Sequence, residues 1–203
     1  MRIKAITIIL VILVATIKLV NASPDTYYLE DNNTLTTTQP VDPYTTVTIS
    51  GGGSYTNTWF STTMGGGTIS SGTYTFTFWM YASNPQTDVT VTFTFGYYNG
   101  GYNQIATATG SFIVNTSYSE MTLSVNVGNP INIPKDSQLY LTVNIQNNEK
   151  GQKTAYFIYS GTTYKTNINT PPISVPEFPM GVFLLPHILL ALYLILKRLP
   201  KLS

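Results

Sequence analysis

The residues of this sequence best suited to binding chemistry are aromatic side chains that the strand pattern directs away from a core. Trp79 and Tyr81 fall on the opposite face of their predicted strand from Phe78. A second group flanks the turn sequence YNGG: Tyr97, Tyr98 and Tyr102. Aromatic planes on a strand or loop can stack on sugar rings, and the phenol adds a polar group. All five are candidate glycan-stacking residues; the alternative is that Trp79 packs beneath a crossing loop or between two sheets.

The titratable residues show no comparable pattern for catalysis. The only histidine is His187 and there is no cysteine, which excludes thiol catalysis, cysteine-ligated zinc and a histidine triad in the central region. The acidic residues are scattered near predicted turns, with no spacing that indicates a glycosidase pair. The oxygen ligands of Glu30, Asp31, Asn32 and Asn33 leave a calcium site open as an alternative, although the EF-hand pattern is missing. We expect no catalytic residue, no cofactor and no enzyme activity.

Two N-x-[ST] sequences predict N-glycosylation in an exported protein. Their acceptors are Asn32, in NNT, and Asn115, in NTS.

The N-terminal segment, residues 1–22, has the pattern of a secretory signal. Arg2 and Lys4 precede the apolar run 5–17, and small residues follow it. The run is shorter than the roughly 20 residues that a spanning helix needs. We therefore predict cleavage between Ala22 and Ser23, with an uncleaved anchor as the alternative.

The C-terminal segment combines an apolar run, residues 180–196, with a basic end. The basic residues are Lys197, Arg198 and Lys201. This stop-transfer pattern predicts a single-pass membrane protein with the basic end inside and the N-terminal domain outside. The run is at the short limit for spanning and contains Pro186, so the tail is either a marginal anchor or a signal that is removed by processing.

Charge along the chain argues against nucleic-acid binding. Most basic residues lie in the two terminal segments, so the central region sets four lysines against the nine acidic residues of the chain. Nucleic-acid partners require clustered Lys and Arg.

The central region alternates apolar and polar residues with the period of a β-strand. The predicted strands are 46–50, 57–62, 73–82, 88–97, 104–114, 120–127, 138–145 and 154–160. Turn-forming sequences separate them. This pattern predicts an all-β fold, an antiparallel two-sheet sandwich that is jelly-roll-like with about eight strands. Gly110 favours a β-bulge in its strand.

The expected organisation has five parts. They are a signal peptide (1–22), an extracellular β-sandwich domain (23–160), a proline-rich stalk (161–179), a transmembrane or sorting helix (180–196) and a basic cytoplasmic tail (197–203). The stalk is expected because prolines fix φ and remove hydrogen-bond donors.

The sequence VPEFP at 175–179, followed by a short apolar run and a basic end, resembles the PEF-CTERM tails of archaeal surface proteins. The resemblance implies that Pro176, Glu177 and Phe178 form a sorting motif read by an archaeosortase-like processing enzyme. The segments YYLEDNNTLTTTQP, SGTYTFTFWMYAS and IYSGTTYKTNINTP are similar to archaeal exported β-sandwich proteins that carry no known activity.

These observations favour a non-enzymatic protein displayed at the cell surface and tethered to the membrane, for adhesion or envelope structure. One alternative is a carbohydrate-binding module that uses exposed Trp and Tyr. Another is a filament subunit that self-associates by donating residues 27–40 to the sheet edge of a neighbour.

Overall fold

The computed structural model describes residues 25–41 and 43–174, and all regular structure in these ranges is β-strand. No helix in this part of the chain is long and apolar enough to cross a membrane. The strands, in chain order, are β1 (Asp25–Leu29), β2 (Leu35–Thr36), β3 (Thr45–Ile49), β4 (Ser54–Thr63), β5 (Gly67–Ile69), β6 (Gly72–Ala82), β7 (Thr87–Tyr98), β8 (Tyr102–Val114), β9 (Ser119–Val127), β10 (Ile131–Ile133), β11 (Gln138–Asn147), β12 (Ala155–Tyr159), β13 (Asn167–Thr170) and β14 (Ile173–Ser174).

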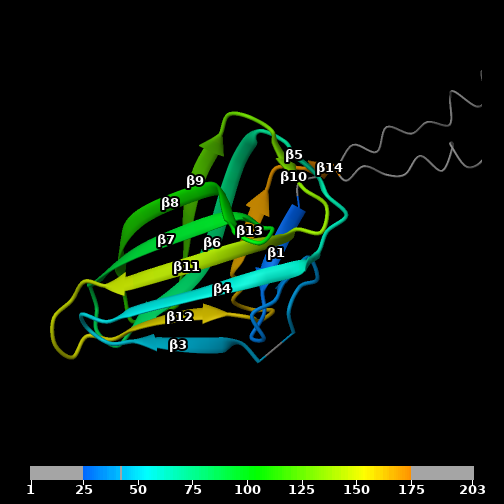
Figure 1. Cartoon of the computed structure of the whole chain (residues 1–203). Helices are drawn as coiled ribbons and strands as arrows, with labels where there is room; N and C mark the ends of the chain where they lie inside the picture. The colour runs from blue at the N-terminus through cyan, green and yellow to red at the C-terminus, as the bar shows by residue number, and fades with distance from the viewer. Residues whose placement is uncertain (1–24, 42, 175–203) are drawn as a thin grey trace, which may run out of the picture.

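Two packed sheets form the body of the domain (Figure 1). The four-stranded sheet has the order β4-β11-β7-β8, and the seven-stranded sheet has the order β2-β1-β13-β6-β12-β3, with β9 paired to the other edge of β6. Opposite β4-β11-β7-β8 lie, in the same direction, β3-β12-β6-β9, which is the strand order of a jelly roll built from two Greek keys. A three-stranded sheet, β10-β5-β14, closes one end. The predicted all-β antiparallel sandwich is confirmed.

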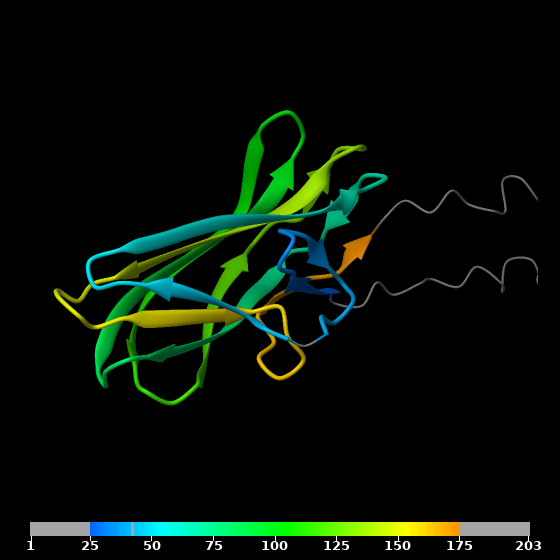
Figure 2. The same ribbon diagram turned by 90° about the horizontal axis from the view of Figure 1, so that it is seen from below.

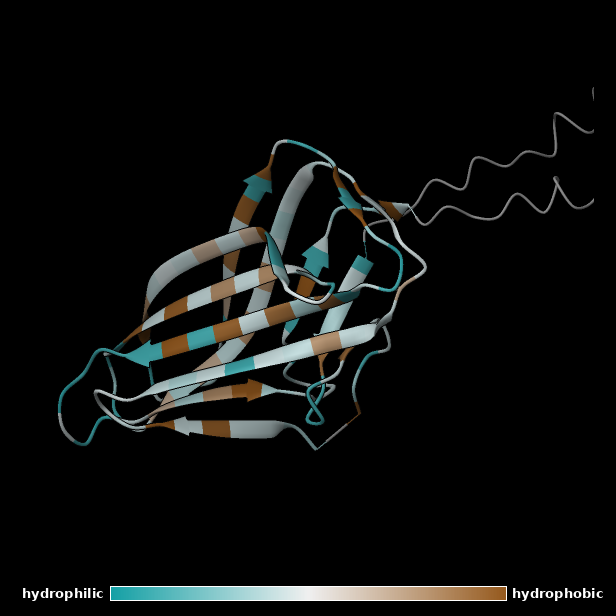
Figure 3. Cartoon of the chain, viewed as in Figure 1, coloured by the Kyte–Doolittle hydropathy of each residue, from teal (hydrophilic) through white to brown (hydrophobic). Residues whose placement is uncertain are grey.

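The core lies between the two sheets and is rich in aromatic rings. Phe76 of β6 packs against Phe93 of β7 with ring centroids 5.2 Å apart, and Phe78 meets Phe112 of β8 edge-on at 5.3 Å. Alternating hydrophobic and polar bands run along β7 and β11, as the period of a strand requires (Figure 3). Each fully buried ring of this size contributes about 1.5–3 kcal/mol to folding. The inward faces predicted from alternation are therefore those that form the core.

Residues 161–174 correct the predicted boundary between domain and stalk. Strand β13 pairs with both β1 and β6, and β14 pairs with β5, so this segment belongs to the sandwich. Ile168 is fully buried. The prolines that suggested a stalk, Pro171 and Pro172, occupy the turn between β13 and β14, where a missing N–H costs no ladder bond. The rest of the predicted stalk, 175–179, lies outside the described residues.

Gly110 does not mark a bulge. It pairs in register with Val91, and the irregularity in the β7–β8 ladder falls instead between Phe95 and Gly96. A Cβ on Gly110 would lie 2.6 Å from the Leu123 side chain of β9. The glycine thus leaves room for the Leu123 side chain, because β9 packs closely over β8.

The segment predicted as a donor strand is paired within its own sheet. Strand β1 lies between β13 and β2, and a turn at residues 30–34 joins β1 to β2. This turn also reaches the edge of the four-stranded sheet. Asn33 accepts the Phe60 N–H at 3.0 Å through its carbonyl, and the Asn57 amide at 2.6 Å through its side chain. Trp59 Nε1 donates to the Glu30 carbonyl at 2.8 Å.

Several predictions lie outside the described residues. They concern the signal peptide with its cleavage site at Ala22 and Ser23, the sorting motif Pro176–Glu177–Phe178, the apolar run 180–196, and the basic residues Lys197, Arg198 and Lys201. Figure 2 shows that β1 and β14, the first and last described strands, lie toward the same end of the sandwich.

Candidate functional site

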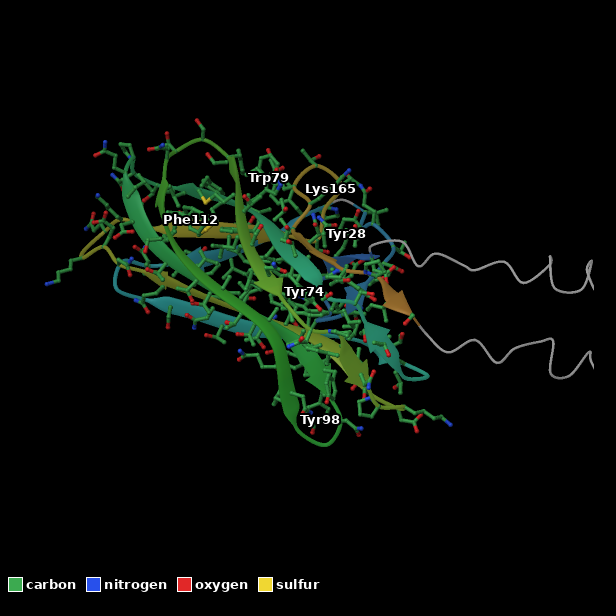
Figure 4. The ribbon with its side chains drawn as sticks, turned by 90° about the horizontal axis from the view of Figure 1, so that it is seen from above. Tyr28, Tyr74, Trp79, Tyr98, Phe112 and Lys165 are labelled. Carbon is green, nitrogen blue, oxygen red and sulfur yellow. The ribbon has the colours of Figure 1, made fainter. Side chains whose placement is uncertain are left out.

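The five candidate glycan-stacking residues separate into three environments. Trp79 and Tyr81 lie on the outer face of the seven-stranded sheet, opposite the buried Phe78 of the same strand, as predicted. Tyr98 and Tyr102 lie at the tip of the β7–β8 hairpin, on the outer side of the four-stranded sheet. Figure 4 shows Trp79 and Tyr98 on opposite sides of the domain.

Tyr97 belongs to neither outer group. Its side chain is half-buried and packs against the hydrophobic core, because alternation along β7 directs it inward.

The hairpin tip carries what we call the hairpin cluster: Phe60, Tyr98, Tyr102 and Tyr140. Tyr102 is the most exposed of these rings at 62% and lies edge-on to Tyr98 and Tyr140, with centroids 5.2 and 5.0 Å away. Tyr140 is only 3% exposed and forms the floor of the cluster. The turn that presents Tyr102 is closed by Gly100, whose φ of 71° is in the left-handed region that glycine adopts without steric cost.

Gly96 makes room for this cluster. A Cβ at this position would lie 2.8 Å from both Cε1 and Oη of Tyr140 and would collide with the Asn103 carbonyl oxygen. The Tyr140 ring therefore lies across the backbone of β7 where no side chain projects. Burial, with Tyr102 nearby, raises the pKa of Tyr140, so its hydroxyl is protonated and uncharged at neutral pH.

Next to the hairpin cluster lies what we call the polar grid. It is formed by the outward side chains of the four-stranded sheet in register: Ser54, Gln146, Thr90 and Ser111; then Thr56, Asn144, Thr92 and Thr109; then Thr58, Thr142, Thr94 and Thr107. Many are hydrogen-bonded to the neighbouring strand, such as Thr58 with Thr142 at 2.8 Å and Thr92 with Thr109 at 2.8 Å. The following row contains Phe60 and Tyr140, so the grid and the hairpin cluster form one continuous surface.

The outer face of the seven-stranded sheet carries a different group, which we call the tyrosine face: Tyr44, Trp79, Tyr81, Tyr118, Tyr156 and Tyr164. Its rings pack on one another. Tyr81 stacks on Tyr156 with centroids 4.4 Å apart and planes at 10°, and Tyr164 stacks on Tyr118 at 4.7 Å and 16°. Tyr164 comes from the loop after β12 and packs on Trp79, with ring centroids 5.2 Å apart, so a loop residue contacts the half-buried Trp79.

Mutual stacking leaves few ring planes of the tyrosine face available to a ligand. Tyr44 and Tyr118 remain 38% and 42% exposed, and a side-chain hydrogen bond between them raises the pKa of Tyr118 to about 12. Charged side chains border the face. Glu120 is exposed on β9 directly beside Trp79, and Lys165 lies on the same side of the domain (Figure 4).

The other candidate sites are simple surface features. Asn32 and Asn115 are both exposed, and their side-chain oxygens accept the backbone N–H groups of Thr34 and Gln86. The residues considered for calcium form the β1–β2 turn. Within residues 25–41 and 43–174, no group of three or more His, Cys, Asp or Glu residues could hold a metal ion.

A cleft of about 250 Å³ opens between β2 and the ends of β4 and β11. Its lining is uncharged: Tyr27, Thr34, Leu35, Thr36, Thr37, Ser61, Thr62, Met64 and Leu139. This volume is below the roughly 300–1,000 Å³ of typical small-molecule sites.

Sequence reasoning missed Phe60, Tyr140 and the polar grid. Alternation in the predicted strands 57–62 and 138–145 already directs Phe60 and Tyr140 away from the core. What no single strand reveals is the pairing register, which places Tyr140 beside Phe60 and Gly96.

No protein-family model matches this chain, and no curated protein is significantly similar to it. Among solved structures, it is similar to an aminopeptidase from the marine sediment archaeon Thaumarchaeota archaeon, with a TM-score of 0.56 and 10% identity over 75% of this chain and 37% of the other. It is also similar to a CocE/NonD family hydrolase from Staphylococcus aureus, with a TM-score of 0.56 and 12% identity over 78% of this chain and 38% of the other. The chain thus spans less than two-fifths of either hydrolase.

The expectation that the protein is not an enzyme is contradicted by these likenesses, because both similar chains are hydrolases. The absence of cysteine, and of histidine from the central region, excludes particular catalytic groups and does not extend to enzymes as a class. At identities of 10% and 12% the likeness establishes a common fold and no particular reaction.

Carbohydrate-binding proteins also occur among the similar structures. One is TmCBM61 in complex with β-1,4-galactotriose, with a TM-score of 0.33 and 12% identity over 69% of this chain and 83% of the other. That TM-score is too low to indicate a common fold or a common ligand.

Proposed function

We propose that the domain binds carbohydrate through the hairpin cluster on the outer side of its four-stranded sheet. The observation that carries the proposal is Tyr102, a ring 62% exposed on a hairpin tip and held edge-on by Tyr98 and Tyr140. A rigid aromatic plane with polar groups beside it is suited to a sugar, which has apolar ring faces and a hydroxyl rim. The neighbouring polar grid supplies hydrogen-bonding groups on the same surface.

The hairpin cluster is the better candidate of the two aromatic surfaces. On the tyrosine face, rings such as Tyr81 and Tyr156 stack on each other, and Tyr164 packs on Trp79, so these ring surfaces are already occupied. Packing against other residues of the same protein, as these rings do, is the usual role of aromatic side chains.

The test compares exposed tyrosines from the two surfaces by titrating the purified full-length chain with glycans selected on an array. We expect Tyr102→Ala to weaken binding at least about tenfold, which is the loss of about 1.4 kcal/mol typical of an aromatic anchor. Tyr102→Phe keeps the plane and should retain most of the affinity. Tyr118→Ala on the tyrosine face is the matched control and should change affinity less than about twofold. Equal effects of Tyr102→Ala and Tyr118→Ala would refute the assignment.

We also propose that the domain is displayed outside the cell and held at the membrane by its C-terminal segment. The signal-like residues 1–22, the VPEFP sequence and the apolar run 180–196 with its basic end support this. The position of β1 and β14 at one end of the sandwich is compatible with a tether at that end.

Intact mass and peptide mapping of the protein from native membranes test the display proposal. A chain from Ser23 to Ser203 would indicate a retained anchor, and a chain ending near Pro179 with added non-peptide mass would indicate processing by an archaeosortase-like enzyme. A chain that still begins at Met1 and is found in the cytoplasm would contradict the proposal.

A further inference from the structure

The polar grid has no charge. Of all residues in β4, β7, β8 and β11, only Asp88 is charged, and it lies at the end of β7 away from the hairpin cluster. An acidic sugar polymer needs Arg or Lys partners for its carboxylates or sulfates. The described lysines, Lys135, Lys150, Lys153 and Lys165, all lie in loops outside these strands. The grid is therefore suited to a neutral ligand.

The hydroxyls of the grid are already oriented. Thr94 and Thr107 are 3.2 Å apart and Thr90 and Ser111 are 3.4 Å apart, in addition to the shorter Thr92–Thr109 pair. Each hydroxyl has one donor and two acceptor positions, and a pair uses one donor and one acceptor between its members. At the Thr92–Thr109 pair one donor and further lone pairs remain. At the Thr94–Thr107 pair only lone pairs remain, because Thr107 Oγ1 also donates to the Phe93 carbonyl at 3.0 Å. A sugar hydroxyl, which both donates and accepts, can therefore bond in either sense to the Thr92–Thr109 pair and can donate to the Thr94–Thr107 pair.

The dimensions of the grid favour a chain over a single sugar. Rows repeat about every 6.7 Å along the strands and strands are about 4.8 Å apart, so the surface presents a regular series of similar contacts. Short Thr and Ser side chains form a shallow surface that cannot enclose a monosaccharide. Individual hydrogen bonds exposed to water contribute little, so useful affinity requires several sugar units bound at once.

Resting on the proposed function, we infer that the ligand is a neutral, extended polysaccharide that lies along the polar grid and ends against the hairpin cluster. Tyr102 and Phe60 provide the stacking end, and the Thr pairs provide successive hydrogen-bonding positions. This assigns a binding role to outward residues of the four-stranded sheet, of which Thr92, Thr94, Thr107 and Thr109 are the centre.

The experiment titrates the full-length chain with neutral cello- and chito-oligosaccharides, from disaccharide to hexasaccharide, and with acidic oligogalacturonates of the same lengths. We expect affinity for a neutral series to rise at least about tenfold from disaccharide to hexasaccharide, and acidic chains to bind more weakly. The double variant Thr92→Val, Thr109→Val should weaken hexasaccharide binding about threefold, because it removes one of several hydrogen-bonding pairs with little change in shape. The matched control is Thr75→Val, Ser124→Ala, which removes a similar pair (3.1 Å) on the seven-stranded sheet and should leave affinity unchanged.

The outcomes separate the two proposals. If acidic chains bind best, or affinity does not depend on length, while Tyr102→Ala still abolishes binding, the grid inference is overturned and carbohydrate binding at the hairpin cluster stands. If Thr92→Val, Thr109→Val has no effect on hexasaccharide affinity, the grid is not part of the site. If Tyr102→Ala leaves saccharide binding unchanged, both proposals fail.

Discussion

The close packing of Tyr140 over Gly96 leads to a quantitative prediction for Gly96→Ala. The new methyl group would lie 2.8 Å from two atoms of Tyr140 and would also meet the Asn103 carbonyl. Tyr140 cannot move away freely, because it is 3% exposed and packed between Phe60 and Tyr102. Overpacking of this kind costs about 1–3 kcal/mol.

This cost should be visible in thermal unfolding. For a domain of about 150–250 residues, 1 kcal/mol corresponds to about 2–4 °C in Tm, so Gly96→Ala is expected to lower Tm by about 2–12 °C. Gly101→Ala is the matched control in the same hairpin, because a Cβ there has no atom within 4 Å. Its Tm should stay within about 1 °C of the parent. Equal Tm values for the two variants, measured by circular dichroism, would refute the close-packing argument.

Two further predictions concern the core and the corrected domain boundary. Tyr74→Phe removes a buried hydroxyl that has no hydrogen-bond partner and should raise the free energy of unfolding by about 1 kcal/mol at pH 8. Burial raises the pKa of Tyr74 from 10.0 to about 12, so the folded state keeps a proton that the unfolded state loses, and stability should fall between pH 10 and 12. In urea titrations, the free energy of unfolding of Tyr74→Phe should fall less between pH 10 and 12 than that of the parent. A Tyr74→Phe variant that is less stable than the parent at pH 8 would contradict this reasoning. A chain ending at Ser160 should fail to show cooperative unfolding, because it lacks β13 and the buried Ile168. A chain ending at Ser174 should unfold cooperatively. Cooperative unfolding of the shorter chain would show that the domain ends at residue 160, as the predicted stalk requires.

The long strands were predictable because each buries one face along its whole length. In β6, β7 and β11 every second residue is apolar over four or more repeats, and only a strand with one buried face produces that period. The short strands β2, β5, β10, β13 and β14 have two to four residues, which is too few to display a period. Their position depends on pairing with distant strands.

The candidate site was predictable only residue by residue. Alternation correctly directs Trp79 and Tyr81 outward. The prediction that groups Tyr97 with Tyr98 does not use the same alternation, which in β7 turns the Tyr97 side chain toward the core. Whether an outward ring is free or covered depends on loops such as the one that carries Tyr164 over Trp79. The polar grid arises from the register among four strands, and that information is not contained in any one of them.

The turn between β1 and β2 has a consequence for how copies of the domain behave side by side. Strand β4 is ten residues long and lies at a sheet edge. Charged side chains and proline commonly protect an edge strand from pairing with another chain, and β4 has neither. Asn33 uses its carbonyl and its side chain to engage Phe60 and Asn57 of this edge. An intruding strand would first have to displace that turn and the Trp59 bond to Glu30. The turn therefore occupies residues 57–60 of this edge, and its removal would expose backbone groups there to pairing with a second copy of the chain.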